Sequence, residues 1–218
     1  MLPSGDLSDL GFVRNGIVET IVSTFDEEHT PHAAPMGVYT EDMRSIILKP
    51  YKTSQTYENL LKWRGGVANI TSDPTLFYGT VFKDANPGGK VPEEWFTHAQ
   101  TIDAPRMRNV DACIEFRVVG VEYSGDQAKI PCRVEKILIT YRPVLRVYSR
   151  AVPAVIESLI HATRIETYLA SGEEKKAEEL IGLVRHYRRI VKRVAPNSTY
   201  SKIMDDIRRR IDGWRRRG

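Results

Sequence analysis

The sequence predicts a mainly β fold, a barrel or sandwich of short antiparallel strands, followed by a helical C-terminal module. Up to about residue 148, β-branched and alternating apolar segments are separated by polar turns. From Val152 onward, apolar residues recur at helical spacing instead. The charges are also unevenly distributed. From Ser171 onward there are 14 Lys/Arg and 7 Asp/Glu, whereas residues 1–170 contain 18 Lys/Arg and 21 Asp/Glu. We therefore expect two domains, residues 1–150 and 151–218.

The first three strands are expected close together in the chain. Gly16 to Phe25 is β-branched with alternating apolar positions, which is typical of a strand. A polar turn precedes a second strand from Ala33 to Tyr39, in which Pro35 marks an edge or a bulge. Ser45 to Leu48 forms the third strand. Pro50 cannot donate to a sheet, so we expect this strand to end before it.

Two helices and one strand are expected next. An amphipathic helix should run from Gln55 to Trp63, and Gly66 to Thr71 is the near-continuous apolar run of a central strand. Asp73 and Pro74 then suit the N-cap and the first position of a second helix. We expect residues 83–108, rich in Pro, Gly and polar side chains, to form a long excursion around the sheet.

The remaining β structure should be a pair of longer strands. Residues 112–123 alternate between apolar and polar side chains, and a turn at 124–126 leads into a strand region at 129–148 that Pro131 and Pro143 interrupt. A hairpin turning near Gly125 would put Cys113 opposite about position 138, so we expect no disulfide between Cys113 and Cys132. We expect a cytoplasmic protein, since the chain also shows neither a signal-peptide pattern nor a membrane-length apolar run.

Three helices are expected in the C-terminal module. Gly172 and the segment at 196–198 separate them. The predicted apolar faces are Val155, Ile156, Leu159, Ile160 and Thr163 in the first helix, Leu180, Leu183, Val184, Tyr187, Ile190 and Val191 in the second, and Ile203, Ile207, Ile211 and Trp214 in the third.

Polar residues cluster where the helix from Gln55 should begin. Lys52, Thr53, Ser54 and Thr56 combine an ammonium and three hydroxyls with the free N–H groups of a helix N-terminus. Such a combination, here called the anion cradle, suits a phosphate group. The alternative is that Thr53 or Ser54 simply caps the helix while Lys52 is solvated.

The order of these segments resembles the FMN-binding split-barrel superfamily, which includes flavin reductase-like and pyridoxamine phosphate oxidase-like proteins. The resemblance rests on a strand containing Ala-Pro-Met-Gly (34–37), a short strand ending in Pro, a helix after Lys-Thr-Ser (52–54), and the strand Val-Ala-Asn-Ile-Thr (67–71). It is best over residues 12–82, extends to 148 and then to 152–164, and is closest to an uncharacterised, largely archaeal family with a helical C-terminal extension. It implies an antiparallel split β-barrel and a homodimer.

The resemblance also implies three parts of an FMN site. The flavin ring would lie against the edge of the second strand, the phosphate in the anion cradle, and the ring or ribityl chain near the end of the fourth strand. The residues are Ala34, Pro35 and Met36 for the ring, Lys52, Thr53, Ser54 and Thr56 with Tyr57 for the phosphate, and Asn69 and Thr71 for the strand end. Deazaflavin is the alternative cofactor. The implied function is that of a flavin reductase-like oxidoreductase; a non-catalytic flavin carrier is an alternative, and no residue is predicted to be catalytic.

Other polar residues leave further alternatives. His29 and His32 have an H-x-x-H spacing, but a third ligand is missing nearby, so we expect no metal site. His161 and Arg164 lie one turn apart on a helix, either as a surface pair or reaching the cofactor or a partner subunit. The basic C-terminal helices could bind nucleic acid. Acidic residues begin the same helix, however, which favours solvated helix ends instead.

Overall fold

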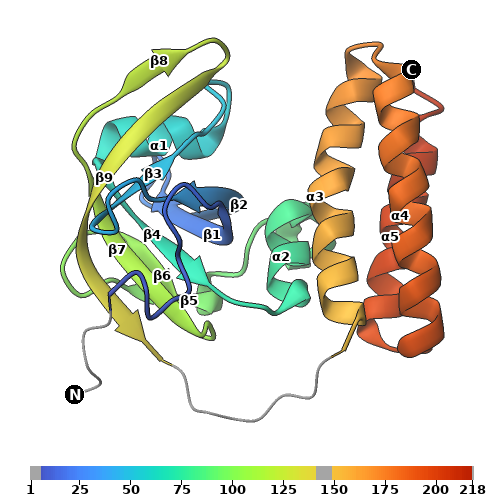
Figure 1. Ribbon diagram of the computed structural model, residues 1–218, viewed down its shortest axis with the longest axis horizontal. Coiled ribbons are helices and arrows are strands. Elements are labelled where there is room, and N and C mark those ends of the chain that lie inside the picture. The colour runs from blue at the N-terminus through green and yellow to red at the C-terminus, as the bar shows by residue number, and fades with distance from the viewer. Residues whose placement is uncertain (1–5, 141–148, 218) are drawn as a thin grey trace. The chain divides into compact units, whose positions relative to one another are not determined.

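Antiparallel strands close into a six-stranded barrel in the first part of the chain. A computed structural model describes residues 6–140 and 149–217 (Figure 1). The barrel strands are β1 (Val18–Phe25), β2 (Pro31–Tyr39), β3 (Ser45–Leu48), β4 (Gly65–Ile70), β7 (Ala112–Val118) and β9 (Gln127–Ile139). The sheet order is β3-β2-β1-β4-β7-β9, and a further pairing of β3 with β9 closes the ring. The predicted barrel is confirmed.

Smaller elements decorate this barrel. Helix α1 (Gln55–Trp63) follows β3, as predicted, and β8 (Glu122–Ser124) forms a hairpin with β9. The expected strand from 112 to 123 is thus divided, because β7 ends at Val118 and β8 begins at Glu122. The excursion at 83–108 contains 3-10 turns and a short hairpin of β5 (Phe96–His98) and β6 (Pro105–Met107). The final part of the expected strand at 129–148, residues 141–148, lies outside the described residues.

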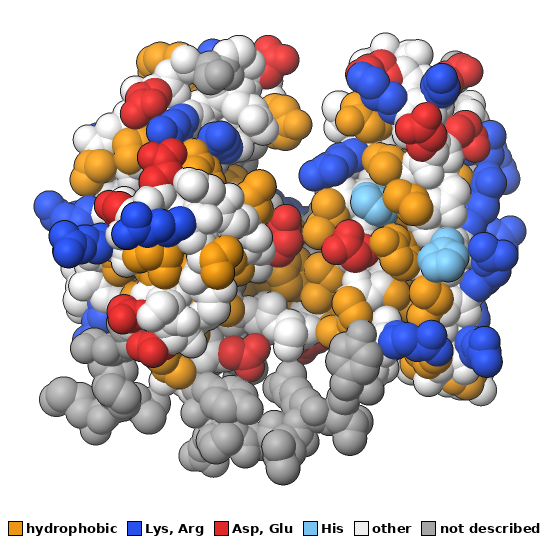
Figure 2. Space-filling model, viewed as in Figure 1, with side chains coloured by type: hydrophobic (Ala, Val, Ile, Leu, Met, Phe, Trp, Pro, Cys, Tyr) orange, Lys and Arg blue, Asp and Glu red, His pale blue; other side chains and the backbone are white. Residues whose placement is uncertain are grey.

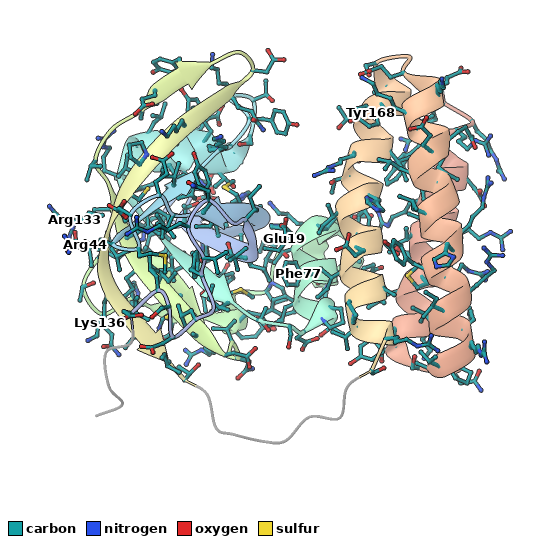
Figure 3. All side chains as sticks on the ribbon, viewed as in Figure 1. Glu19, Arg44, Phe77, Arg133, Lys136 and Tyr168 are labelled. Atoms are coloured by element: carbon teal, nitrogen blue, oxygen red, sulfur yellow. The ribbon has the colours of Figure 1, made fainter. Side chains whose placement is uncertain are left out.

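Apolar side chains fill the barrel. Val22, Ile46, Leu48, Ile114 and Ile130 are fully buried in one cluster. Polar side chains take the outside: Arg44, Arg133 and Lys136 project from β9 and from the turn before β3 (Figure 3).

The register of β7 and β9 agrees with the prediction for the cysteines. Cys113 pairs with Leu138, whereas Cys132 pairs with Val118, and both thiols are free and buried. Burial raises the pKa of Cys113 to about 11 and raises that of Cys132 as well.

The second part of the chain is helical. It comprises α3 (Ala151–Ala170), α4 (Glu174–Val194), α5 (Thr199–Trp214) and also α2 (Pro74–Val81), which packs against α3 and α5. Residues 72–81 thus group with the C-terminal helices, a segment that the expected boundary at residue 150 assigned to the first domain. None of the helices in the described residues is long and apolar enough to cross a membrane.

The predicted apolar faces of the helices are confirmed in part, and the prediction for Thr163 of α3 was wrong, because it is exposed. All four residues predicted for α5 are buried, as are Val155 and Leu159 of α3. In α4 the buried face is Ala177, Ile181, Val184 and Val191. The prediction for Leu183 was wrong, because its side chain is 43 % exposed. Leu183 comes directly before the buried Val184, so it points about 100° away from the buried face of α4.

Candidate functional site

The anion cradle lies where β3 passes into α1. Ser54 is the N-cap of α1: its Oγ accepts a hydrogen bond from the Tyr57 N–H (3.3 Å) and donates one to the Tyr51 carbonyl (2.7 Å). The structure therefore assigns Ser54 the role of helix cap, which was one of the two alternatives that the sequence allowed. Both hydrogen-bonding functions of its hydroxyl are used within the helix start.

The other members of the cradle keep donors available. Lys52 is half-buried; its backbone N–H donates to the Asp126 carbonyl (3.0 Å), and its ammonium lies 5.2 Å from the centre of the Tyr123 ring. No carboxylate among the described residues pairs with this ammonium. Thr53 is exposed, and the N–H of Gln55 precedes the first intrahelical hydrogen bond. An ammonium, a hydroxyl and a helix N-terminus are thus left for an anion.

Thr56 belongs to a chain of three polar side chains. His32 on β2 contacts the Thr56 hydroxyl through Nε2 (3.2 Å) and the Lys83 ammonium through Nδ1 (3.1 Å). An ammonium group can only donate hydrogen bonds, so Nδ1 of His32 accepts from Lys83. The imidazole is therefore neutral, and its Nε2–H donates to the Thr56 hydroxyl. Thr56 is buried, with 1 % of the residue exposed. Sequence reasoning missed Lys83, which lies 51 residues from His32 and gives no local signal.

The electrostatics of this chain agree with a neutral imidazole. Burial, followed by the charge of Lys83, lowers the pKa of His32 to about 4. Burial also lowers the pKa of the Lys83 ammonium. His32 thus stays neutral near pH 7 and positions Thr56 without adding a charge to the cradle.

The residues expected against a flavin ring lie on an open strand edge. Ala34, Pro35 and Met36 are half-buried on β2. Strand β2 pairs with β1 along its whole length but with β3 only through Val38 and Tyr39. Its first part therefore has one free side, on which backbone groups are available to a ligand. His32 is on the same strand, so this edge and the first turn of α1 are neighbours.

Tyr57, Asn69 and Thr71 have different surroundings. Tyr57 is 9 % exposed within the barrel core, and burial with a hydrogen bond to Tyr123 raises its pKa. The Asn69 amide is fully buried and bonded to protein: its NH₂ donates to the Ile21 carbonyl (2.8 Å), and its oxygen accepts from the Met107 N–H (3.0 Å). Thr71 is half-buried just after β4.

His161 and Arg164 belong to the helical unit. His161 is half-buried on α3 and its ring lies nearly parallel to that of Tyr187, with centroids 6.0 Å apart. Its Nδ1 has no hydrogen-bond partner among the described residues, and burial lowers its pKa. Arg164 is exposed. That this pair reaches a cofactor or a partner subunit stays a prediction.

His29 and His32 are directed to different partners. The His29 ring stacks on Phe25 at 3.8 Å, and its Nε2 lies 3.3 Å from an Asp103 carboxylate oxygen. Among residues 6–140 and 149–217, no group of three or more His, Cys, Asp and Glu side chains is placed to hold a metal ion.

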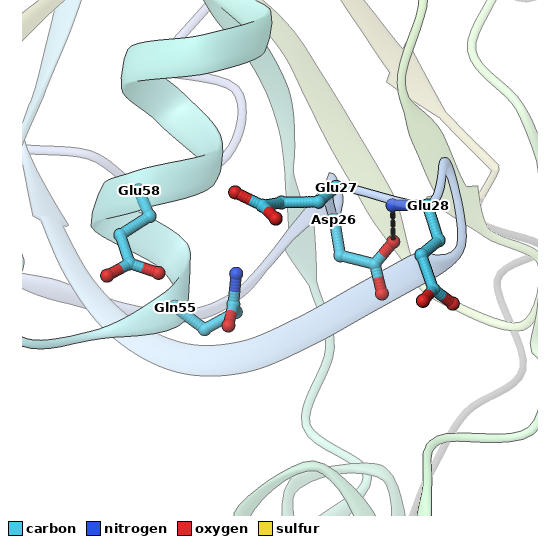
Figure 4. A pocket seen from close by; sticks show the side chains of 5 residues that line it. All are labelled: Asp26, Glu27, Glu28, Gln55 and Glu58. Atoms are coloured by element: carbon cyan, nitrogen blue, oxygen red, sulfur yellow. Dashed lines mark hydrogen bonds between the residues drawn. The ribbon is translucent and has the colours of Figure 1, made fainter.

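An acidic hollow of about 310 Å³ lies beside the start of α1 (Figure 4). It is lined by Asp26, Glu27, Glu28, Gln55 and Glu58. The Asp26 carboxylate accepts from the Glu28 N–H (3.0 Å) and stabilises the turn between β1 and β2. Four carboxylates repel an anion, so this hollow is not suited to a phosphate.

Two family models match this chain. The first, described as "Protein of unknown function (DUF447) N-terminal domain", covers residues 18–141, and the second, "Protein of unknown function (DUF447)", covers residues 149–209.

Solved structures are also similar. The FMN-bound protein MM1853 from Methanosarcina mazei is 28% identical with a TM-score of 0.75, covering 94% of this chain and 99% of its own. The styrene monooxygenase flavin reductase from Pseudomonas putida S12 is 14% identical with a TM-score of 0.48, covering 57% of this chain and 82% of its own. The flavin reductase component BorF of a bacterial two-component tryptophan halogenase is 14% identical with a TM-score of 0.48, over 63% and 89%.

Replacing Ser54 should destabilise the barrel unit. Because Ser54→Ala removes the N-cap of α1, we expect the free energy of unfolding to fall by about 1 kcal/mol. Thr53→Ala, at the neighbouring exposed position, should change it by less than about 0.5 kcal/mol. Urea denaturation monitored by tryptophan fluorescence measures both variants. Equal stabilities for the two would contradict the capping role.

The buried His32 should make stability depend on pH. Folding lowers the pKa of His32 from its usual 6.5 to about 4, so the unfolded chain binds the proton more tightly. Stability should therefore fall as the pH drops from 6.5 to 4. Between pH 7 and pH 5 the wild type should lose about 2 kcal/mol more than His32→Gln, which cannot titrate. Denaturant melts at both values measure the difference, and parallel losses would contradict a neutral His32.

Proposed function

Because the chain belongs to the DUF447 family, we propose that it is an FMN-binding flavoprotein with a flavin reductase-like barrel. The observation that carries the proposal is the similarity over nearly the whole length to the FMN-bound protein from Methanosarcina mazei. The geometry of the barrel unit supports it from the residues upward.

The donor set at α1 fits a phosphate. Lys52 supplies a charge without a carboxylate partner and Thr53 an exposed hydroxyl, whereas Thr56 is only 1 % exposed and contacts His32. The N–H of Gln55 adds a donor at the positive end of the helix. Ser54 contributes by holding the helix start in shape.

The open edge of β2 fits a flat ring with polar edges. Ala34, Pro35 and Met36 offer an apolar surface, and the unpaired side of the strand offers backbone groups to the pyrimidine part of a flavin. When bound, the flavin supplies the electron-transfer chemistry, while the protein binds and orients it. Asn69 would act indirectly, since its amide joins β1, β4 and β6 behind this edge.

Oxidoreductase activity is the finer part of the proposal. It follows from the resemblance to flavin reductases, whereas a non-catalytic flavin carrier would use the same binding residues. The nucleic-acid alternative is less favoured, because several basic side chains of α4 have carboxylate partners: Arg188 and Lys192 pair with Asp205 at 2.7 and 2.5 Å. Such pairs fit solvated helix faces.

A homodimer is also part of the proposal. Ile17 is 71 % exposed and Val13 is 65 % exposed, although both are apolar. Ile17 covers Gly37 of β2, where a Cβ atom would come within 2.8 Å of the Ile17 side chain. Ile17 lies next to Gly37 of β2, the strand proposed to line the flavin, so a subunit boundary at Ile17 would bring the cofactor site near it.

FMN binding should depend on the cradle through its phosphate. The purified protein, mixed with FMN, should keep a flavin spectrum through gel filtration. Lys52→Ala/Thr53→Ala should weaken FMN binding at least tenfold, or about 1.4 kcal/mol, because it removes charge-assisted hydrogen bonds. Riboflavin, which has no phosphate, should bind both proteins alike. Fluorescence titration measures all four affinities.

The control is Lys136→Ala, which removes a charge from the outer surface of β9 (Figure 3) and should leave FMN affinity unchanged. Equal losses of affinity for FMN and riboflavin would contradict the phosphate assignment. Tight binding of a deazaflavin, together with no binding of FMN, would identify the deazaflavin as the cofactor instead. Anaerobic addition of NADH or NADPH separates enzyme from carrier, because only an oxidoreductase using that donor would bleach the flavin absorbance.

Replacing Ile17 should dissociate the homodimer. A carboxylate in an apolar interface loses its hydration, so Ile17→Asp should sediment as a monomer at micromolar concentration while the wild type sediments as a dimer. Leu183→Asp, at a 43 % exposed position on α4, is the control and should stay dimeric. A wild type that is monomeric with FMN bound would overturn the homodimer.

A further inference from the structure

A second hollow lies in the helical unit and is lined by cations. Its volume is about 320 Å³, and its lining residues are Arg150, His186, Arg189, Ile190 and Arg193. Four of them come from α4 at intervals of three and four residues, so they lie on one face of that helix. Arg150 is the N-cap residue of α3 and has no side-chain capping bond.

Arg189 and Arg193 differ from most other cations of α4. Arg185 lies 3.9 Å from Glu178, and Asp205 of α5 takes both Arg188 and Lys192. Within the described part of the chain, neither Arg150, Arg189 nor Arg193 has an ion-pair partner. On α4, therefore, Arg185, Arg188 and Lys192 have carboxylate partners. Arg189 and Arg193, which line the hollow, have none among the described residues.

The arrangement is mildly unfavourable in the absence of an anion, because the three arginines are exposed and solvent partly screens their repulsion. Arg189 and Arg193 are four residues apart, a spacing at which like charges on a helix repel. The negative end of the helix dipole compensates Arg193, which lies in the last turn of α4, but its effect fades beyond that turn. Arg150 stands at the opposite, positive end of α3, so its charge is not compensated in this way. A bound anion would relieve all three.

We propose that this hollow binds a small compound carrying two or more linked phosphate groups, a function separate from the flavin site. Guanidinium groups present paired N–H donors that match phosphate oxygens. Three of them around one hollow can each engage a different phosphate group of such a compound. Three of the five lining residues are arginines, so the charge of the ligand lies in its phosphates, while Ile190 and the His186 ring leave room for an attached group.

A nucleic-acid strand fits the surface less well. In Figure 2, Lys and Arg side chains follow one another down the outer edge of the helical unit, and carboxylates lie among the basic side chains at its upper end. Asp205, Asp206 and Asp212 all pair with basic side chains of α4 or α5. A phosphate backbone needs a continuous basic stripe, whereas a short polyphosphate needs only the uncompensated cluster.

The test uses the full-length protein and inorganic tripolyphosphate in isothermal titration calorimetry at 150 mM salt. We expect saturable binding to one site per chain. Arg189→Gln/Arg193→Gln should weaken it at least tenfold while leaving FMN affinity unchanged. Because neither arginine has an ion-pair partner, the melting temperature of this variant should not fall.

The matched control is Lys202→Gln/Arg216→Gln, which removes two exposed charges elsewhere in the helical unit and should weaken binding less than twofold. Equal losses in the two variants would show a general charge effect and overturn the site, as would the absence of saturable binding. A 20-nucleotide single-stranded RNA that binds more tightly than tripolyphosphate, with equal losses in both variants, would assign the surface to nucleic acid instead.

Discussion

The pairing of β3 with β9 is the constraint on which the proposed flavin site depends. It closes the barrel in an antiparallel register from Ser45 opposite Arg133 to Leu48 opposite Ile130. Backbone hydrogen bonds between the two segments continue beyond the end of β3. The Ala128 N–H donates to the Pro50 carbonyl and the Lys52 N–H donates to the Asp126 carbonyl, both at 3.0 Å. Closure of the barrel therefore fixes the chain that enters α1, and with it the cationic side of the cradle.

Buried polar side chains then tie the neighbouring elements to this barrel. The Asn59 amide of α1 donates to the Thr24 hydroxyl of β1 (2.9 Å), which holds the helix against the sheet. The carboxylate of Glu115, fully buried on β7, accepts from the N–H groups of Gln100 and Thr101, each at 2.8 Å. Because an unpaired buried polar group is costly, each bond favours one arrangement of its loop or helix. The bond between Asn59 and Thr24 thus helps to hold α1, and with it the cradle, against β1.

In the helical unit, single carboxylates each pair with two basic side chains. Arg209 and Arg210 share Asp206, as Arg188 and Lys192 share Asp205. The Tyr78 hydroxyl of α2 also donates to Asp206 (2.7 Å), and burial with this hydrogen bond raises the pKa of Tyr78 to about 12. A basic composition therefore does not by itself define a nucleic-acid surface, since the meaning of each cation depends on whether a carboxylate lies beside it.

Local patterns determined much of this protein. Alternation predicted β1 and β7, an apolar run predicted β4, Ser54 was foreseen as a possible cap, and the turn at Gly125 gave the register of Cys113 opposite residue 138. These features follow from side-chain periodicity and turn chemistry, which act over a few residues. Only the tertiary structure joined His32 to Lys83 across 51 residues, buried Asn69 among protein partners, and separated the paired arginines of α4 from the unpaired ones. Such contacts depend on which elements pack together, and a sequence pattern does not encode the partner that a side chain meets far along the chain.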